Sequence, residues 1–381
     1  MQGGEQKVAF SRPFFGKEEA DGAAAAVASG WVVGGPRLAE LEQKIAAACG
    51  AEFAVGVSSW TTGAFLVLKS LGIGPGDEVI VPSLTFIATV NAIVHAGATP
   101  VFADVDLATF NIDPEDVSTR LTGRTRAILP VDQLGLPCEI DAINEIAHAH
   151  GLLVVQDAAC SFGSRYKGKP VGSLAPVTVF SLHARKVVTT GEGGMIVTDD
   201  SALSARLRRQ RHQGMSLSDF ERHNVSPTAF ETYPEVGYNF RMTDIQAAVG
   251  VAQMDRLDDI LARRRRIATR YVEALKAHPF LVPPLAPPHV EPNWQSFQLR
   301  IREDSPLTRN EIMERLHESG IATRRGVMAS HLEQPYQGMG LRLPNTENLA
   351  KWAFQLPIYP DLSESEVDYV IERLLAFGGA D

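Results

Sequence analysis

Short apolar runs that alternate with helical stretches restrict the fold of this chain more than any other feature. Seven runs of four to six residues, rich in valine, isoleucine and phenylalanine, are typical of buried strands. They lie at 53–57, 78–81, 99–103, 125–130, 152–156, 177–180 and 194–198. Helical patterns at 64–71, 89–96 and 139–150 separate several of them. This alternation predicts an α/β domain with a seven-stranded, mostly parallel sheet covered by helices.

Candidate functional side chains follow the ends of these runs. Ligands of open parallel sheets bind beyond the carboxyl ends of the strands, so side chains that follow several strands meet at one edge. The residues in question are Trp60, Thr61 and Thr62 after the first run, Phe86 after the second, Gln133 after the fourth, Asp157 after the fifth and Ser181 after the sixth. We therefore expect one site at this edge of the sheet.

A lysine and an aspartate stand at the ends of two of these strands. The strand at 177–180 leads to Ser181, His183 and Lys186, and the strand at 152–156 leads to Asp157. A lone lysine is usually a solvated surface charge. A lysine beside a carboxylate suits pyridoxal 5'-phosphate (PLP), whose aldehyde reacts with an amine and whose ring nitrogen needs an acidic partner. His183 fits an active-site role and a satisfied polar network equally well.

Hydroxyl groups near 59–62 indicate a phosphate site. Thr61 and Thr62 stand where a helix begins after a strand, and a helix amino terminus offers free N–H groups to an anion. Helix capping is the ordinary role of such hydroxyls. Together with Ser181 they predict a phosphate cup. The glycine-rich stretch at 72–76 follows a helix and precedes a strand, which is the reverse of a dinucleotide-binding loop, so we interpret it as a turn.

The carboxyl-terminal third has a different pattern. Residues 238–275 indicate a loop that runs into one long helix, and four arginines at 263–266 spread around that helix and are expected to be solvated. A proline-rich stretch at 283–292 precedes a strand pattern at 296–301 and helices near 307–319 and 364–377. We predict a large domain at 1–252, with the extreme amino terminus packed on the small domain, and a small α+β domain with its bridging helix at 253–381.

Composition excludes several classes of protein. A net charge of −9 argues against general nucleic-acid binding, because that binding depends on lysine and arginine side chains that neutralise phosphate groups. Three scattered cysteines give no zinc or other metal site. No apolar run reaches the length of a membrane span, and the polar residues 1–7 lack a targeting core, so we expect a cytoplasmic protein without membrane contact.

Several motifs resemble those of the DegT/DnrJ/EryC1/StrS family of nucleotide-sugar aminotransferases. The motifs are 181–186 with 189–195, 237–248, 72–88 and 356–360, so the resemblance covers nearly the whole chain. It implies the PLP-dependent transferase fold type I, which is the fold of aspartate aminotransferase. It also implies a homodimer with PLP at the dimer interface.

The resemblance assigns roles to individual residues. Lys186 matches the Schiff-base lysine, Asp157 the partner of the ring nitrogen and Phe86 the aromatic side chain that stacks on the ring. The phosphate contacts match Thr61, the Thr62 backbone and Ser181, with Asn239 reaching in from the other subunit.

Two positions depart from the family pattern. Cys160 stands where many relatives carry glutamine or histidine near the ring hydroxyl. Trp60 replaces a small residue, and we expect it to narrow the entrance for the substrate.

The implied activity is amino transfer from glutamate or glutamine to a keto group of a nucleotide-linked deoxysugar. Relatives that dehydrate carry histidine at the position of Lys186, so the lysine favours amino transfer. A local basic patch has to meet the anionic substrate, and two sets of candidates are available. The first set is Arg324 with Arg325, and the second is Arg208, Arg209 and Arg211, while ordinary surface ion pairs explain these arginines equally well. His331 and Trp60 are further candidates for contact with the substrate. Loops at 31–36, 220–235 and 322–336 are expected to select the sugar.

Two alternatives stay open at this point. The first is an aminotransferase for a keto-cyclitol of an aminoglycoside-type pathway, which has no nucleotide. The second is a protein that binds PLP as a sensor or regulator without turnover.

Overall fold

A central sheet of seven strands organises the structure, a computed structural model that describes residues 7–217, 226, 228, 230–338 and 340–378. The strand order is β1-β9-β8-β5-β4-β2-β3. The strands are β1 (Phe53–Val57), β2 (Glu78–Pro82), β3 (Thr99–Ala103), β4 (Thr125–Ile128), β5 (Leu153–Asp157), β8 (Val177–Ser181) and β9 (Gly194–Thr198). Only β9 runs antiparallel to its neighbours in this sheet. The predicted seven-stranded, mostly parallel sheet is confirmed, and each strand lies within two residues of its predicted bounds.

The reversed strand β9 brings a glycine to the functional edge. Gly194 pairs with Val57 at the end of β1 and with Ser181 at the end of β8. A Cβ atom at Gly194 would lie 2.5 Å from the carbonyl carbon of Ser59, which is too close for any other residue. The glycine therefore allows the turn before α3 to sit directly against the sheet edge.

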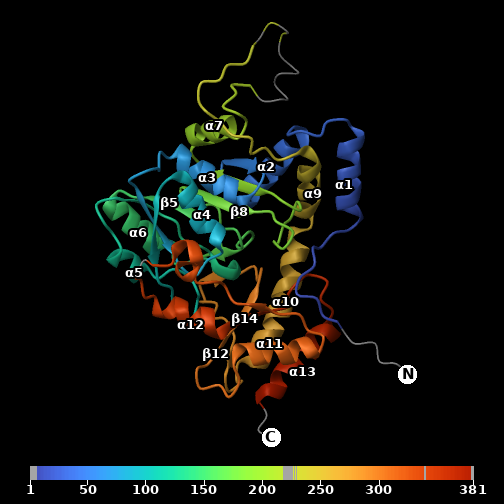
Figure 1. Ribbon diagram of the computed structural model, residues 1–381. Coiled ribbons are helices and arrows are strands. Elements are labelled where there is room, and N and C mark those ends of the chain that lie inside the picture. The colour runs from blue at the N-terminus through green and yellow to red at the C-terminus, as the bar shows by residue number, and fades with distance from the viewer. Residues whose placement is uncertain (1–6, 218–225, 227, 229, 339, 379–381) are drawn as a thin grey trace.

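Helices surround this sheet (Figure 1). They are α1 (Lys17–Ala28), α2 (Pro36–Cys49), α3 (Trp60–Ser70), α4 (Ile87–Ala96), α5 (Pro114–Thr119), α6 (Ile140–His150) and α7 (Ser201–Gln210). Helix α3 begins at a capping box in which the Ser59 side chain accepts from the Thr62 N–H. Apolar side chains of α3 and α4 pack with strand residues of the sheet in one core cluster. Because α3 follows β1 directly, its amino terminus lies at the same edge as Ser181.

The predicted single long helix is two helices. Helix α9 (Asp244–Asp255) packs beside α1, and α10 (Leu257–Leu275) runs toward the carboxyl-terminal elements (Figure 1). The break lies at Arg256, with φ −107° and ψ 7°. Its guanidinium donates to buried Glu19 at 2.9 Å and lies over the Phe14 ring. The apolar stripe continues through the break, so the sequence pattern could not reveal it.

The arginine run at 263–266 also departs from its prediction. Arg263, Arg265 and Arg266 pair with carboxylates at the surface. Arg264 is instead buried and donates to the backbone oxygens of Trp294, Gln295 and Ile358. The expectation of a wholly solvated helix turn is therefore wrong for Arg264, because one of four consecutive helical positions must face the protein.

The carboxyl-terminal elements form a second layer around an antiparallel sheet of order β10-β12-β14-β13. Its strands are β10 (Leu281–Val282), β12 (Phe297–Ile301), β13 (Arg324–Arg325) and β14 (Ala353–Leu356), and its helices are α11 (Arg309–Glu318), α12 (Pro344–Trp352) and α13 (Glu364–Leu375). These elements share an apolar core that includes Val8 and the part of α10 from Ile267 onward. Ile260 and Leu261 of α10 pack with the large sheet instead. The domain division at 252/253 falls within α9 and stays a prediction.

A small sheet that the sequence did not predict joins the two parts. Its strands are β6 (Arg165–Tyr166), β7 (Lys169–Pro170) and β11 (Val290–Glu291), in the order β11-β6-β7. The proline-rich segment at 283–292 thus ends in a strand that returns to the large sheet's side of the molecule. In the described part of the chain, no helix has the length and the apolar character that crossing a bilayer requires.

Candidate active site

The lysine and the aspartate predicted to work together lie at one edge of the sheet. Asp157 ends β5 and is paired in parallel with Val179 of the adjacent β8. Strand β8 ends at Ser181, and Lys186 follows in a turn closed by its N–H bond to the carbonyl of His183, at 2.8 Å. Lys186 is near enough to Asp157 for its charge to lower the pKa of that carboxyl. The fold therefore brings an amine and an acid together.

The Asp157 carboxyl is buried without a strong counterion. Its side chain is 3% exposed, and burial raises its pKa to about 7 despite hydrogen bonds from the Ala159 N–H (3.0 Å) and the Thr89 hydroxyl (2.8 Å). Within the residues that the structure describes, no basic side chain comes within 4 Å of it. A cationic group placed beside this buried, unpaired carboxyl would stabilise its ionised form.

The raised pKa of Asp157 predicts how the stability of the cofactor-free protein depends on pH. The folded form holds the proton to a higher pH than the unfolded form, whose carboxyl has a pKa near 3.8. Stability should therefore fall as the pH rises from about 4 to about 7, by up to about 4 kcal/mol, and then level off. Urea unfolding of wild type and Asp157→Asn at pH 5 and pH 8 measures this. Equal pH dependence in the two proteins would contradict it.

Two threonines that the sequence analysis missed support Asp157. The Thr89 hydroxyl donates its hydrogen to Asp157 Oδ2. The Thr85 hydroxyl lies 2.8 Å from Thr89 Oγ1. Because the Thr89 hydrogen is already used, Thr85 donates to Thr89 in this second bond. All three side chains are buried. Thr85 lies just before the N-cap Phe86 and Thr89 lies in the first turn of α4, so the two hydroxyls come from the two sides of the helix start.

The amino terminus of α3 is partly open. The Thr62 N–H already donates to the Ser59 side chain at 3.1 Å, so the expected Thr62 backbone contact requires that this cap opens. The Trp60 and Thr61 N–H groups have no protein acceptor in the described part of the chain. Ser181 Oγ, at the neighbouring strand end, has one weak donor, the His183 N–H at 3.4 Å. These groups fit an anion at a helix amino terminus.

Phe86 and Asn239 are both exposed. Phe86 precedes α4 and its side chain is 60% exposed, so it is not a core residue, and its ring is available to stack on a ligand. Asn239 lies in a segment that pairs with His212, and it also faces outward. Contact between Asn239 and a second copy stays a prediction.

Trp60 does not lie at an entrance. Its side chain is 6% exposed, belongs to the main core cluster and donates from Nε1 to the Val179 carbonyl at 3.0 Å. This placement corrects the expectation that Trp60 narrows the substrate mouth, since the indole packs beneath α3 and links that helix to β8.

Cys160 and His183 flank Lys186 differently. The Lys186 amine lies 3.2 Å from the free thiol of Cys160, so this departure from the family pattern does lie in the site. His183 accepts from the Arg185 N–H at Nδ1 (3.3 Å), and its Nε2 lies 3.7 Å from Glu192 Oε1. Partial burial lowers the pKa of His183. These contacts favour the polar-network interpretation of His183.

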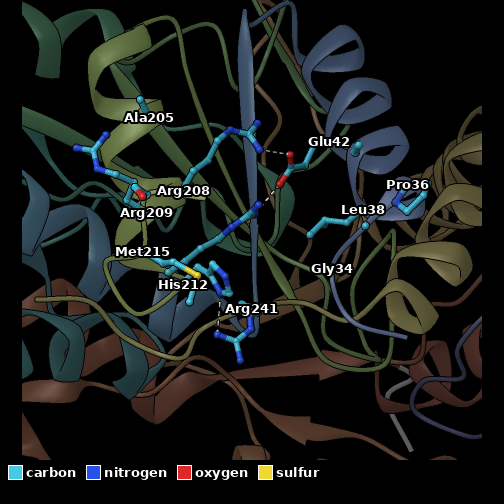
Figure 2. Close-up of a pocket in the computed structure, with 14 residues that line it drawn as sticks. Gly34, Pro36, Leu38, Glu42, Ala205, Arg208, Arg209, His212, Met215 and Arg241 are labelled. Carbon is cyan, nitrogen blue, oxygen red and sulfur yellow. Dashed lines mark hydrogen bonds and ion pairs between the residues drawn. The ribbon is translucent and has the colours of Figure 1, made fainter. Parts of the chain in front are cut away.

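The arginines of α7 do not form a free basic patch. Arg208 and Arg211 both pair with buried Glu42 of α2, and Arg209 pairs with Glu235. These arginines and Glu42 line a hollow of about 530 Å³. Figure 2 shows the Arg208 side chain pointing toward Glu42, with Arg241 below them. Three arginines are thus committed to two carboxylates, and the expectation that this set binds the substrate loses its support.

The other substrate candidates are divided. Arg324 and Arg325 of β13 are exposed, Arg324 over the Phe10 ring and Arg325 3.7 Å from Glu333. His331 is 4% exposed, so it does not face an open site. Of the loops expected to select the sugar, 31–36 leads into α2 and 322–336 contains β13, whereas much of 220–235 lies outside the described residues.

The chain matches a known protein family and has similar relatives. The model of the DegT/DnrJ/EryC1/StrS aminotransferase family matches residues 13–375. The spore coat polysaccharide biosynthesis protein SpsC of Bacillus subtilis (strain 168) is 40% identical over 371 residues, which cover 96% of this chain and 95% of SpsC.

Two solved structures share the fold. The putative sugar aminotransferase Spr1654 of Streptococcus pneumoniae, in its PLP form, is 29% identical with a TM-score of 0.90, covering 98% of this chain and 99% of Spr1654. DesI in the presence of its TDP-sugar product is 33% identical with a TM-score of 0.87, covering 98% of this chain and 93% of DesI. The predicted aspartate-aminotransferase-like fold is confirmed. The chain therefore belongs to the DegT/DnrJ/EryC1/StrS aminotransferase family.

Proposed function

We propose that this protein is a homodimeric PLP-dependent aminotransferase that converts a keto group of a nucleotide-linked sugar to an amine, with glutamate or glutamine as donor. The observation that carries the proposal is the shared edge of Lys186, Asp157 and the open amino terminus of α3. The proposal includes a cytoplasmic location.

The residues present fit PLP. A buried carboxyl with a raised pKa suits a protonated ring nitrogen, and the unpaired N–H groups of α3 suit a phosphate. The exposed ring of Phe86 suits a stacking partner. Bound PLP would supply the electron sink that stabilises negative charge at the carbon bearing the amino group.

The protein's own groups would do the rest. The Lys186 amine would hold the cofactor covalently and, once released by the amino donor, carry the proton between substrate carbon and cofactor. Asp157 would keep the ring nitrogen protonated, because neutralising that nitrogen would leave the carboxylate buried and unpaired. The Thr85–Thr89 hydroxyl chain would orient the Asp157 carboxyl, and Cys160 would contact Lys186.

The nature of the acceptor rests on the relatives. DesI was solved with a TDP-sugar product, and SpsC serves polysaccharide biosynthesis. Both are compatible with a sugar nucleotide as substrate. The exposure of Asn239 is compatible with the proposed contact with a second copy.

A panel experiment tests the proposal. Purified protein with PLP and glutamate or glutamine is incubated with 3-keto and 4-keto sugar nucleotides, and the products are analysed by mass spectrometry. An amino sugar nucleotide from one member of the panel is the expected result. Turnover of keto-cyclitols alone would support the cyclitol alternative, and PLP binding without any product would support a sensor.

Replacing Arg324 and Arg325 together by alanine should weaken binding of the sugar nucleotide. The two exposed guanidinium groups supply local positive charge on an acidic protein, and charge-assisted bonds to phosphate oxygens contribute about 1.5–3 kcal/mol each. We expect KM for the sugar nucleotide to rise at least about tenfold, with KM for the amino donor unchanged. Arg302→Ala, which removes an arginine paired with Asp304 at the surface, is the control. An unchanged KM for the sugar nucleotide would remove these arginines from the site.

A further inference from the structure

A buried segment of the carboxyl-terminal part lies against the loop that precedes α4. Ala329 forms an isolated bridge with Leu84, and the Ser330 N–H donates to the Ser83 carbonyl at 2.7 Å. The Ser330 hydroxyl donates to the Thr85 carbonyl at 2.9 Å. Two parts of the chain about 245 residues apart are therefore joined by backbone and side-chain bonds at the residue that begins the threonine chain.

His331 completes this contact. The backbone N–H of His331 donates to Ser83 Oγ at 3.1 Å, and the ring atom Nδ1 lies 2.6 Å from the same oxygen. Because Ser83 Oγ already accepts from the backbone, its own hydrogen is free to be donated to Nδ1. The neutral imidazole with its hydrogen on Nε2 accepts the bond from Ser83 at Nδ1, and Nε2 lies 3.7 Å from Glu347 Oε1. A protonated ring would leave the Ser83 hydrogen without an acceptor, and Ser83 is completely buried.

The contact continues to the catalytic edge. The Thr85 hydroxyl donates to Thr89 Oγ1, and the Thr89 hydroxyl donates to Asp157 Oδ2. Both bonds are 2.8 Å long. Ser83, Thr85, Thr89, Ser330 and His331 are all buried, so water does not replace any of these bonds at low cost. Donors that point the same way along a chain strengthen one another. Only the bonds from the Thr85 hydroxyl through Thr89 form a chain that ends on the Asp157 carboxylate. Ser330 joins this chain through the backbone of Thr85, because its hydroxyl bonds the Thr85 carbonyl.

We propose that Ser330 and His331 are positioning residues, through which the carboxyl-terminal part fixes Ser83 and Thr85 and thereby orients Thr89 toward Asp157. The inference rests on the proposed function, since Asp157 matters here as the partner of the PLP ring nitrogen. It gives His331 a role other than substrate contact, in agreement with its burial.

The variants follow from the geometry. His331→Leu removes the acceptor of the Ser83 hydroxyl, while His331→Asn keeps an acceptor oxygen near the position of Nδ1. Ser330→Ala removes only the hydroxyl that donates to the Thr85 carbonyl, and we expect it to fold. It therefore still tests the proposal if His331→Leu does not fold. His278→Leu is the matched control, because the partly buried His278 bonds the Leu374 carbonyl in the carboxyl-terminal part, away from Asp157.

The measurement is the Kd of the full-length protein for PLP, with thermal unfolding of the cofactor-free form as a check of folding. We expect His331→Leu and Ser330→Ala to raise Kd about tenfold, the effect of losing one buried bond of about 1.4 kcal/mol. His331→Asn should stay within about threefold of wild type, and His278→Leu should bind as wild type does.

A double-mutant cycle separates positioning from general destabilisation. In a Thr89→Val background the chain to Asp157 is already broken, so His331→Leu should then raise Kd less than about twofold. A full tenfold effect in that background, or wild-type affinity in both single variants, would overturn the inference. If wild type itself binds no PLP, the proposed function fails and this inference fails with it.

Discussion

Replacing Lys186 with alanine is expected to lower the rate of amino transfer at least about 10³-fold. The amine is the only lysine group that the structure brings near both Asp157 and Cys160 among the described residues, and it is proposed to hold the cofactor and move the proton. Positioned acid–base groups contribute about 10²–10⁴-fold, and loss of the covalent link adds to this. Single-turnover kinetics with glutamate and PLP, followed by the absorbance of the cofactor, measures the effect.

Lys167→Ala is the matched control for Lys186→Ala. Lys167 pairs with Asp141 at the surface, and both side chains are more than half exposed, so its loss should leave the rate unchanged. A Lys186→Ala protein that keeps more than a tenth of the wild-type rate would show that the amine at this position is not part of the chemistry.

Asp157→Asn is expected to lower the rate about 10²–10³-fold while the protein stays folded. Asparagine keeps the size of the side chain, and the Thr89 and Thr85 hydroxyls can reverse direction to accept from its amide. What it loses is the negative charge that stabilises a protonated ring nitrogen, and breaking a buried charge pair costs about 3–5 kcal/mol. The loss should fall on kcat more than on KM for the sugar.

The pH dependence of stability distinguishes this effect from misfolding. The cofactor-free Asp157→Asn protein should be at least as stable as wild type at pH 8, because it no longer carries a buried charge. A variant with a normal rate would contradict the role of Asp157. A variant that loses both its rate and its stability at pH 8 would show that Asp157 acts in folding.

The sheet and the position of the site were predictable because their signals are local. Each strand of the large sheet is a short apolar run. Asp157 and Ser181 end two parallel strands, so they lie at the same edge of the sheet. The capping box of α3 follows the same local rules.

The remaining features depend on partners far along the chain. The pairing of Arg208 with Glu42 joins positions 166 residues apart, and no local pattern shows that these charges are already neutralised. Arg256 at the helix break bonds Glu19, 237 residues away, and the buried Trp60 bonds Val179, 119 residues away. The contact of His331 with Ser83 spans 248 residues, so the sequence could not distinguish a substrate residue from a positioning residue.

The most direct test of the account is the site of covalent attachment of PLP. The full-length protein is incubated with PLP, reduced with borohydride, digested and mapped by mass spectrometry. We expect one reduced pyridoxyl phosphate group per chain, on the peptide that contains Lys186, and none on the Lys186→Ala protein. A label on another lysine, or no label on wild type, would contradict it.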